Sequence, residues 1–220
     1  MNNSQWPHRT VIPVAIPGLK FIFAAASITG LLFLMGWAIP GWGAFFVTLF
    51  ICWFFRDPER VVPDHGNCMV SPADGRIIVV EEKNTNEFTN DHCIKISIFM
   101  NVFNVHVNRI PFKGVIEKVI YIPGRFINAS FDKASEYNER NALVIRTDSG
   151  NLYGVVQIAG LIARRIVCKV SQGDTMERGS RYGMICFGSR LDLYIPSNSR
   201  VVVDLGQKVQ AGSTILAYLE

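Results

Sequence analysis

The chain has 220 residues, a formal net charge of +4 and an apolar fraction of 49%. Its mean hydropathy of +0.22 is high for a soluble domain and predicts a membrane-embedded part. There is no dense lysine and arginine run and no interleaving of basic and aromatic residues, so no nucleic-acid partner is expected. Five scattered cysteines without a Cys-x-x-Cys pair argue against a disulfide framework and against a zinc site, and free thiols are expected.

An uncharged apolar stretch runs from Phe21 to Phe55. Its 35 residues exceed the roughly 20 that one spanning helix needs, and Pro40-Gly41-Trp42-Gly43 interrupts it. After an N-terminal segment, 1–20, we therefore expect a membrane hairpin of two short helices, about 21–39 and 44–55, joined by a tight turn. A shallow re-entrant hairpin and one long tilted span are the alternatives.

Basic residues flank the apolar stretch on both sides, Arg9 and Lys20 before it and Arg56 and Arg60 after it. Positive charge on both sides favours a hairpin with both ends in the cytoplasm. The stretch is too long, and begins too far into the chain, for a cleaved signal peptide. The expected location is the cell membrane, with the rest of the chain on its cytoplasmic face.

After about residue 66, short β-branched and aromatic runs alternate with Gly, Pro, Asn and Asp. This pattern predicts a mainly β fold, a barrel-sandwich-like antiparallel domain over 56–220. A hairpin turn is expected at 148–151, and a helical turn or a loop within 127–138. The expected strands are 75–82, 93–100, 105–109, 114–122, 142–147, 152–158, 165–170, 183–187, 191–195, 200–204 and 214–218.

A weak internal repeat lies in the last fifty residues. Gly173-Asp-Thr-Met-Glu-Arg-Gly179-Ser180 resembles Gly206-Gln-Lys-Val-Gln-Ala-Gly212-Ser213. In both, two glycines six residues apart precede a serine and an apolar strand, as in the paired hairpins of lipoyl-type barrel sandwiches. The repeat explains two of the three Gly-Ser bonds of the chain as turns and leaves Gly188-Ser189 unexplained.

Gly188-Ser189 can support a reaction of the chain on itself. The serine hydroxyl can attack the glycine carbonyl, which no side chain shields, and glycine supplies backbone flexibility. If the resulting ester eliminates, the chain breaks and Ser189 becomes a pyruvoyl group, a carbonyl electrophile made from the protein. The plainer interpretation is a hairpin turn between two strands. Ser213 ranks second as a cleavage site, because a cut there would leave only a short tail.

Two other segments offer polar groups for this chemistry. Ser71-Pro-Ala-Asp74-Gly75 places an acid in a turn directly before a strand, although Asp-Gly is also simply a good turn pair. Asn104-Val-His106-Val-Asn108 alternates polar and apolar residues, which puts the histidine and both asparagines on one face. Such a face is unusual for a core and fits a site, whereas a lone strand histidine is more often a hydrogen-bonded surface residue.

Several motifs in order carry a resemblance to a known family. Over about 200 of its 220 residues the chain resembles the short form of phosphatidylserine decarboxylase. Any one motif is unspecific, but five in the right order are specific. The motifs are Phe54-Phe-Arg-Asp-Pro58, Ser71-Pro-Ala-Asp-Gly75, Phe103-Asn-Val-His-Val-Asn-Arg-Ile-Pro111, Val156-Gln-Ile-Ala-Gly160 with Ala163-Arg-Arg165, and Arg181-Tyr-Gly-Met-Ile-Cys-Phe-Gly-Ser189.

The resemblance implies a proenzyme that cuts itself between Gly188 and Ser189 into a β chain, 1–188, and an α chain, 189–220. The pyruvoyl group derived from Ser189 would be the cofactor and would form a Schiff base with the amine of phosphatidylserine. It would accept the electrons released as CO2 leaves, as pyridoxal phosphate does. By the same resemblance Asp74 assists self-cleavage, and His106 lies beside the pyruvoyl group and protonates the carbanion, so that phosphatidylethanolamine is released.

The chain departs from longer family members at Arg109. They carry a His-x-x-His pair in this strand, and the second histidine joins the aspartate and the serine in self-cleavage. Here Asp74 acting alone, or His106 acting in both steps, are the alternatives for the base. Arg109 could hold the lipid phosphate or the serine carboxylate, or form a structural ion pair; Asn108 and Gln157 are the other candidates for substrate binding.

The implied partners are phosphatidylserine in the membrane and the chain's own second fragment, with higher oligomers left open. A non-catalytic membrane-anchored adaptor built on a barrel sandwich is the alternative function. It would not explain Asp74, His106 and Ser189 together, and the chain lacks a hairpin-tip lysine for lipoylation and the heptads of membrane-fusion proteins. A relative that decarboxylates a soluble amine, such as an amino acid, would have no use for a membrane hairpin.

Overall fold

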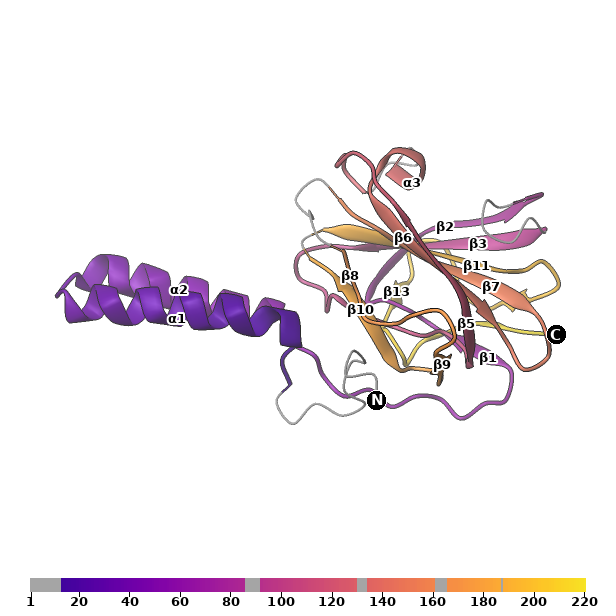
Figure 1. Ribbon diagram of the computed structural model, residues 1–220, viewed down its shortest axis with the longest axis horizontal. Coiled ribbons are helices and arrows are strands. Elements are labelled where there is room, and N and C mark those ends of the chain that lie inside the picture. The colour runs from indigo at the N-terminus through magenta and orange to yellow at the C-terminus, as the bar shows by residue number, and fades with distance from the viewer. Residues whose placement is uncertain (1–12, 86–91, 130–133, 161–165, 187) are drawn as a thin grey trace. The chain divides into compact units, whose positions relative to one another are not determined.

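The computed structural model describes residues 13–85, 92–129, 134–160, 166–186 and 188–220. Within them the chain forms two compact units that divide between Glu59 and Arg60. The first unit is a pair of helices and the second is built of strands (Figure 1). The predicted fold class, a mainly β domain preceded by an apolar helical pair, is therefore confirmed.

The first unit contains the 3-10 turn η1, Ile16–Gly18, and the helices α1, Leu19–Leu34, and α2, Ala38–Phe54. The stretch Ile16–Leu34 is long and apolar enough to cross a membrane, and α2 is shorter. The expected break at 40–43 is wrong, because the chain turns between the helices at 35–37, where Gly36 has a φ of +75°. Pro40 instead lies in the first turn of α2, where a helix needs no amide donor.

Polar and aromatic contacts join the two helices of this unit. The hydroxyl oxygens of Thr29 and Thr48 lie 3.0 Å apart, and the Phe21 and Phe55 rings stack with centroids 5.5 Å apart. Many other apolar side chains of the helices are exposed, among them Leu34 at 88%. An apolar surface of this kind is unfavourable in water and suits contact with lipid.

An eight-stranded antiparallel sheet is the main element of the second unit, in the order β13-β2-β3-β11-β7-β6-β5-β9. The sheet is strongly curled (Figure 1). Its strands are β2 (Gly75–Lys83), β3 (Cys93–Met100), β5 (Gly114–Ile122), β6 (Arg140–Arg146), β7 (Leu152–Ile158), β9 (Thr175–Met176), β11 (Ser189–Pro196) and β13 (Lys208–Val209).

Two three-stranded sheets complete this unit, with the orders β1-β14-β12 and β4-β10-β8. Buried apolar side chains from the large sheet and both small sheets form one common core. The remaining elements are β1 (Cys68–Val70), β4 (Val107–Arg109), β8 (Ile166–Cys168), β10 (Arg181–Ile185), β12 (Arg200–Val201), β14 (Ile215–Tyr218) and the one-turn helix α3 (Ala134–Tyr137).

The two copies of the internal sequence repeat have the same local structure. All four of its glycines have φ between +73° and +90°, which favours glycine. Gly173 donates its amide to Ile116, the third residue of β5, and Gly206 donates to Ile77, the third residue of β2, both at 2.8 Å. The short strands β9 and β13 follow these two glycines and lie at opposite edges of the large sheet. The interpretation of the repeated Gly-Ser bonds as turns is therefore confirmed.

Most expected strands lie within a few residues of observed ones, and the hairpin turn is confirmed by the bonds between Thr147 and both Gly150 and Asn151. β4 begins at Val107 rather than at 105, because the preceding residues belong to a loop. Three very short strands, β1, β9 and β13, were not predicted, since two or three residues show no alternation. Among the residues of expected elements, 130–133, 165 and 187 lie outside the described part of the chain, as does the whole motif 163–165.

Candidate active site

Two crossovers between the sheets start and end at paired strands, and they contain or adjoin two of the residues that the sequence singles out, His106 and Ser189. One leads from β3 into β4 and the other from β10 into β11. Met100 pairs with Ser189 at one end of these crossovers, and Val107 pairs with Met184 at the other. His106 directly precedes β4 and Ser189 is the first residue of β11, so the structure places both of them in these adjacent segments.

Ser189 is fully buried, and strand pairing defines its neighbours. Met100 lies directly opposite on β3. Because Leu191 pairs with Gln157, the Gln157 side chain is a diagonal neighbour of Ser189 on the same face, about 7–8 Å away. Within the described residues the Ser189 hydroxyl makes no hydrogen bond. A buried hydroxyl without a partner is unfavourable, and its presence here is consistent with a chemical role.

The carbonyl of Gly188 lies in a close-packed position. Gly188 itself has a φ of +62°, a conformation that favours glycine. Gly160, two residues after β7, lies against this carbonyl so closely that a Cβ atom at residue 160 would overlap its oxygen. The absence of a side chain at residue 160 therefore allows the bond between residues 188 and 189 to take its observed position.

Three buried amide side chains near Ser189 are linked to one another by hydrogen bonds. Asn141 Nδ2 donates to Gln157 Oε1 at 3.2 Å, and Gln157 Nε2 donates to Asn108 Oδ1 at 2.9 Å. Asn108 Nδ2 in turn lies 3.9 Å from Met100 Sδ. Asn108 therefore contacts both strand neighbours of Ser189, and its amide is held in one orientation by them.

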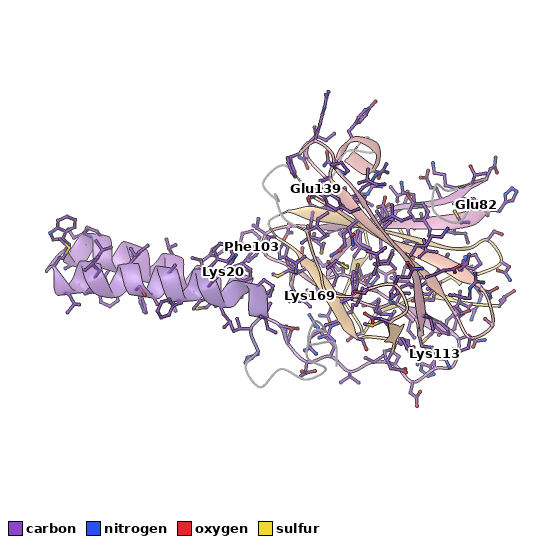
Figure 2. All side chains as sticks on the ribbon, in the orientation of Figure 1. Lys20, Glu82, Phe103, Lys113, Glu139 and Lys169 are labelled. Carbon is purple, nitrogen blue, oxygen red and sulfur yellow. The ribbon has the colours of Figure 1, made fainter. Side chains whose placement is uncertain are left out.

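His106 is fully buried, and its carbonyl accepts a hydrogen bond of 3.4 Å from the Ile185 amide. This bond extends the β4–β10 pairing by one residue, so alternation along the strand places His106 and Asn108 on the same face, as predicted. Asn104, which was expected on that face too, instead lies in the loop, where its side chain accepts from the Asn101 amide at 2.9 Å. Phe103 in the same loop is 63% exposed at the surface of the molecule (Figure 2), so this crossover runs from the surface into the interior.

Asp74 lies beside the β3–β4 crossover, but its carboxylate is occupied. The turn that carries it runs along β4, where the Arg109 amide donates to the Pro72 carbonyl at 2.9 Å. Asp74 Oδ2 accepts from Arg60 Nη2 at 2.8 Å, and Asp74 Oδ1 accepts from the Ala211 amide at 2.8 Å. Both partners of the ion pair are largely buried, with side chains 14% and 12% exposed. The carboxylate is thus held rigidly by a cation and a backbone amide.

Arg109 lies on the opposite face of β4 from Asn108, between the two repeated turns. Its Nη1 donates to the Gly179 carbonyl at 2.9 Å, and a Cβ atom at Gly212 would lie 2.9 Å from Arg109 Cδ. The residue is only 4% exposed. These contacts favour a structural role for Arg109; its role in substrate binding stays a prediction.

The same two turns hold residues 60–67, which we call the strap because they connect α2 to β1. Ser213 Oγ donates to the Val61 carbonyl at 3.1 Å, and Arg178 Nη1 donates to the His65 carbonyl at 2.9 Å. A Cβ atom at Gly179 would overlap the side chain of Val62. The repeat therefore fixes the strap, and with it the position of the Arg60 guanidinium on Asp74.

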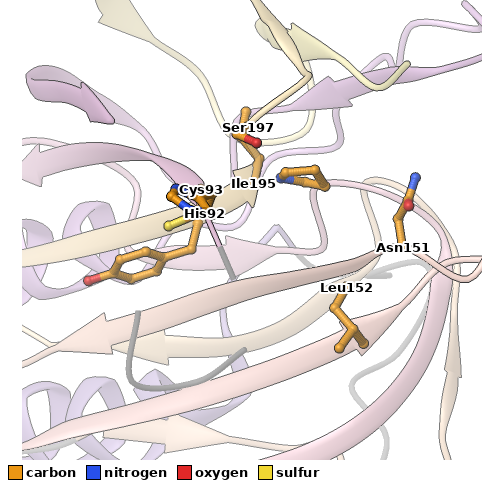
Figure 3. Close-up of a pocket in the computed structure, with 8 residues that line it drawn as sticks. His92, Cys93, Asn151, Leu152, Ile195 and Ser197 are labelled. Carbon is orange, nitrogen blue, oxygen red and sulfur yellow. The ribbon is translucent and has the colours of Figure 1, made fainter. Parts of the chain in front are cut away.

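The pocket drawn in Figure 3 is not the candidate site. Ile195 and Ser197, which help to line it, lie at the far end of β11 from Ser189, about 20 Å away along the strand. Among the described residues, no group of His, Cys, Asp and Glu side chains is arranged to hold a metal ion. The candidate site is therefore the region around His106 and Ser189, with the side chains of β3, β4 and β7 that adjoin them.

Comparison with known proteins identifies the family. The family model for phosphatidylserine decarboxylase matches residues 47–217. This chain belongs to the phosphatidylserine decarboxylase family. The phosphatidylserine decarboxylase proenzyme of Ralstonia nicotianae is 48% identical over 99% of this chain and 100% of its own length. The proenzyme of Burkholderia vietnamiensis is 50% identical over 98% of this chain and 99% of its own length. The proenzyme of Syntrophus aciditrophicus is 54% identical over 77% of this chain and 79% of its own length.

Membership of the phosphatidylserine decarboxylase family confirms the resemblance seen in the sequence and favours an enzyme over an adaptor. Three residues next to the site nevertheless had no assigned role: Arg60, Gly160 and Arg190. In the sequence, Gly160 stands in a motif, and Arg60 is one of the charges that flank the apolar stretch. Arg190 carried a usable signal, because Arg190 and Asp192 are opposite charges two residues apart in an otherwise apolar strand, which places them on one face.

Burial raises the pKa of three ionisable groups of the β unit, two phenols and one thiol. Burial raises the pKa of the Tyr153 and Tyr182 phenols, both of which lie in the core. Burial also raises the pKa of the Cys168 thiol on β8. None of the five cysteines forms a disulfide, as predicted. At neutral pH these groups hold their protons, so none of the three is a candidate for the base.

Proposed function

We propose that this chain is a proenzyme that cuts itself between Gly188 and Ser189 and then converts phosphatidylserine to phosphatidylethanolamine and CO2. Membership of the family supports the reaction. The observation that carries the cleavage site is the buried Ser189 hydroxyl, which has no hydrogen bond among the described residues and follows the Gly188 carbonyl directly. The other two Gly-Ser bonds, by contrast, belong to the repeated turns that hold the strap.

Self-cleavage begins with attack of Ser189 Oγ on the Gly188 carbonyl carbon. An ester C–O bond forms, and the amide C–N bond breaks as its nitrogen takes up a proton. Loss of the Cα proton of residue 189 then breaks the Cβ–Oγ bond, which frees Gly188 as a carboxylate. The dehydroalanine left at residue 189 takes up water and releases ammonia, which leaves a pyruvoyl group at the head of the α chain, 189–220, beside the β chain, 1–188.

His106 is the proposed base for the Ser189 hydroxyl. It shares a face of the β4 segment with Asn108, which contacts both strand neighbours of Ser189. Asp74 is the weaker candidate, because Arg60 and Ala211 already occupy its two oxygens. Its assisting role is to keep the turn before β2 in place beside the crossover.

The surroundings of residue 189 suit a pyruvoyl group. The position is buried, Met100 faces it, and an amide chain lies at its side. When present, a pyruvoyl group condenses with a primary amine and takes up the electron pair released by loss of CO2. His106 supplies the proton that the product carbon needs. Asn108 and Gln157 are the proposed contacts of the polar headgroup, whereas Arg109, on the opposite face of β4, is proposed to hold the turn at Gly179.

The helical unit is the proposed membrane anchor, with the β unit on the cytoplasmic face, because a lipid substrate has to be met at the headgroup plane. Leu31→Asp, on an exposed position of α1, tests this. A charge inside a bilayer costs about 2.5–3.5 kcal/mol, so the variant should lose binding to phosphatidylserine vesicles and keep its activity on short-chain, soluble phosphatidylserine. Val202→Asp, on an exposed position of the β unit, is the control. Equal vesicle binding by Leu31→Asp and the wild type would argue against the anchor.

The three Gly-Ser bonds provide a matched test of the cleavage site. Ser189→Ala should stay as one chain and lack decarboxylase activity, because alanine has no oxygen with which to attack. Ser180→Ala removes the same group from the first repeated turn and should be cut as in the wild type. Ser213→Ala also removes the bond to the Val61 carbonyl of the strap, so it should still be cut between residues 188 and 189, at a rate no higher than that of the wild type. Cleavage of Ser189→Ala, or a wild-type fragment that begins at residue 180 or 213, would place the site elsewhere.

A further inference from the structure

A fully buried ion pair directly follows the proposed cleavage site. Arg190 and Asp192 are both 0% exposed, and Arg190 Nε donates to Asp192 Oδ1 at 2.6 Å. Arg190 Nη2 also donates to Ser97 Oγ on β3 at 2.8 Å. The guanidinium thus ties the second residue of β11 both to its own strand and to the neighbouring strand. Neither self-cleavage nor decarboxylation as proposed above uses this pair.

Further polar groups complete the cluster on the same face. Lys95 Nζ lies 3.3 Å from Asp192 Oδ2, and Ser135 Oγ donates to the same oxygen at 2.9 Å. Lys95 belongs to β3 and Ser135 to α3, so the cluster joins β11 to two other elements. Strand alternation places this cluster on the opposite face of the sheet from Ser189 and Leu191. It therefore holds the strand from behind without touching the site.

Cleavage changes what holds residue 189. In the uncut chain Gly188 restrains it on one side and Arg190 on the other. After the cut it is a chain end, and chain ends are poorly ordered unless something ties them down. β11 pairs with β3 from Ser189 onward but with β7 only from Arg190 onward. Arg190 is the first residue of the new α chain to have a strand on both sides and a buried side-chain anchor.

We propose that Arg190 is a positioning residue, which keeps the reactive group at residue 189 in place once the chain has been cut. The inference rests on the function proposed above. It separates the two reactions: self-cleavage takes place while Gly188 still restrains residue 189, whereas decarboxylation takes place afterwards. Loss of the Arg190 contacts should therefore affect the second reaction much more than the first.

Arg190→Lys in the full-length chain tests this, because lysine keeps the charge beside Asp192 but cannot reach Asp192 and Ser97 together with a planar fork. We expect cleavage at a nearly unchanged rate, an unchanged KM, and a kcat lower by about tenfold to a hundredfold, the scale of a misplacement of about 1 Å. Hydrogen exchange should be faster in the first residues of the cleaved α chain, a readout independent of activity. Arg146→Lys is the control and should match the wild type, because Arg146 of β6 forms an exposed pair with Glu117 of β5.

Ser97→Ala is the second variant, because it removes one acceptor of Arg190 without leaving a buried charge alone. Ser97→Ala should also lower kcat, by a smaller factor than Arg190→Lys does. Unchanged kcat and exchange in both variants, or a fall of cleavage and kcat in equal proportion, would overturn the role of Arg190 while leaving the proposed function intact. A wild-type chain that is active and uncut would overturn both, since no free end would exist.

Discussion

Gly160 lies directly against the carbonyl oxygen of Gly188, so that a Cβ atom at residue 160 would overlap this oxygen. The two residues come from different segments, one after β7 and the other before β11. The carbonyl that Ser189 is proposed to attack is therefore positioned by a residue with no side chain. The motif that contains Gly160 gains a physical explanation from this contact.

Gly160→Ala should slow self-cleavage, because the added methyl group must displace the Gly188 carbonyl or the strand end behind it. A displacement of about 1 Å costs up to about a hundredfold in rate. The fraction of cut chain can be followed over time after cell-free synthesis. Gly154→Ala, where a Cβ atom would have no neighbour closer than 3.6 Å, is the control. If both variants were cut at the wild-type rate, the contact between Gly160 and Gly188 would not be needed for self-cleavage.

The two candidate bases can be compared directly. If His106 takes the Ser189 proton, His106→Gln should slow self-cleavage by about 10²–10⁴-fold, the usual contribution of a positioned base. Asp74→Asn keeps the shape of the side chain and its bond from Ala211, so its effect should be smaller. The same cleavage time course measures both. A larger loss in Asp74→Asn than in His106→Gln would assign the base to Asp74.

Arg60→Ala should destabilise the strap and the turn before β2 together. It leaves the largely buried Asp74 carboxylate without its cation, an effect of about 1–3 kcal/mol on the free energy of unfolding. Slower self-cleavage should accompany the loss, and added guanidinium ion should restore part of the rate. Arg146→Ala, from an exposed pair, is the control and should change stability by less than about 1 kcal/mol. If Arg60→Ala were cut at the wild-type rate, the ion pair between Arg60 and Asp74 would make no contribution to self-cleavage.

Alkaline pH should destabilise the β unit through its buried phenols. Burial raises the pKa of Tyr153 and Tyr182, while in the unfolded chain these phenols titrate near pH 10. Above about pH 10 the unfolded state binds fewer protons than the folded state, so the free energy of unfolding falls as the pH rises. Thermal unfolding in detergent at about pH 7 and about pH 10.5 measures this loss.

Each Tyr→Phe variant should lose less stability than the wild type between about pH 7 and about pH 10.5, because one buried phenol is gone. The two variants should differ from each other in stability at neutral pH. Tyr153 donates to the Phe112 carbonyl, so Tyr153→Phe should cost about 0.5–1.5 kcal/mol there. The Tyr182 hydroxyl makes no hydrogen bond among the described residues, so Tyr182→Phe should be close to neutral. The same alkaline loss in the wild type and in both variants would contradict the assignment of these phenols.

The strands and the repeated turns could be predicted because their signals are local. Runs rich in β-branched and aromatic residues mark β3 and β7, and paired glycines mark the turns around β9 and β13. The candidate site residues Asp74, His106 and Ser189 were singled out through motifs and stay a prediction. Their surroundings were not singled out, because Arg60 on Asp74, Gly160 on Gly188 and Ser97 on Arg190 are contacts between residues far apart in the chain. The predicted start of the second helix was wrong because a proline in the first turn of a helix and a proline that ends a helix look alike in sequence.

The intact mass of the purified protein under denaturing conditions tests the central claim most directly. The account predicts two chains, 1–188 and 189–220, with a pyruvoyl group in place of an amino terminus on the smaller one. A fragment that begins at residue 213 would move the cleavage site to the second repeated turn. A single chain of 24.6 kDa in a preparation that decarboxylates phosphatidylserine would contradict the mechanism.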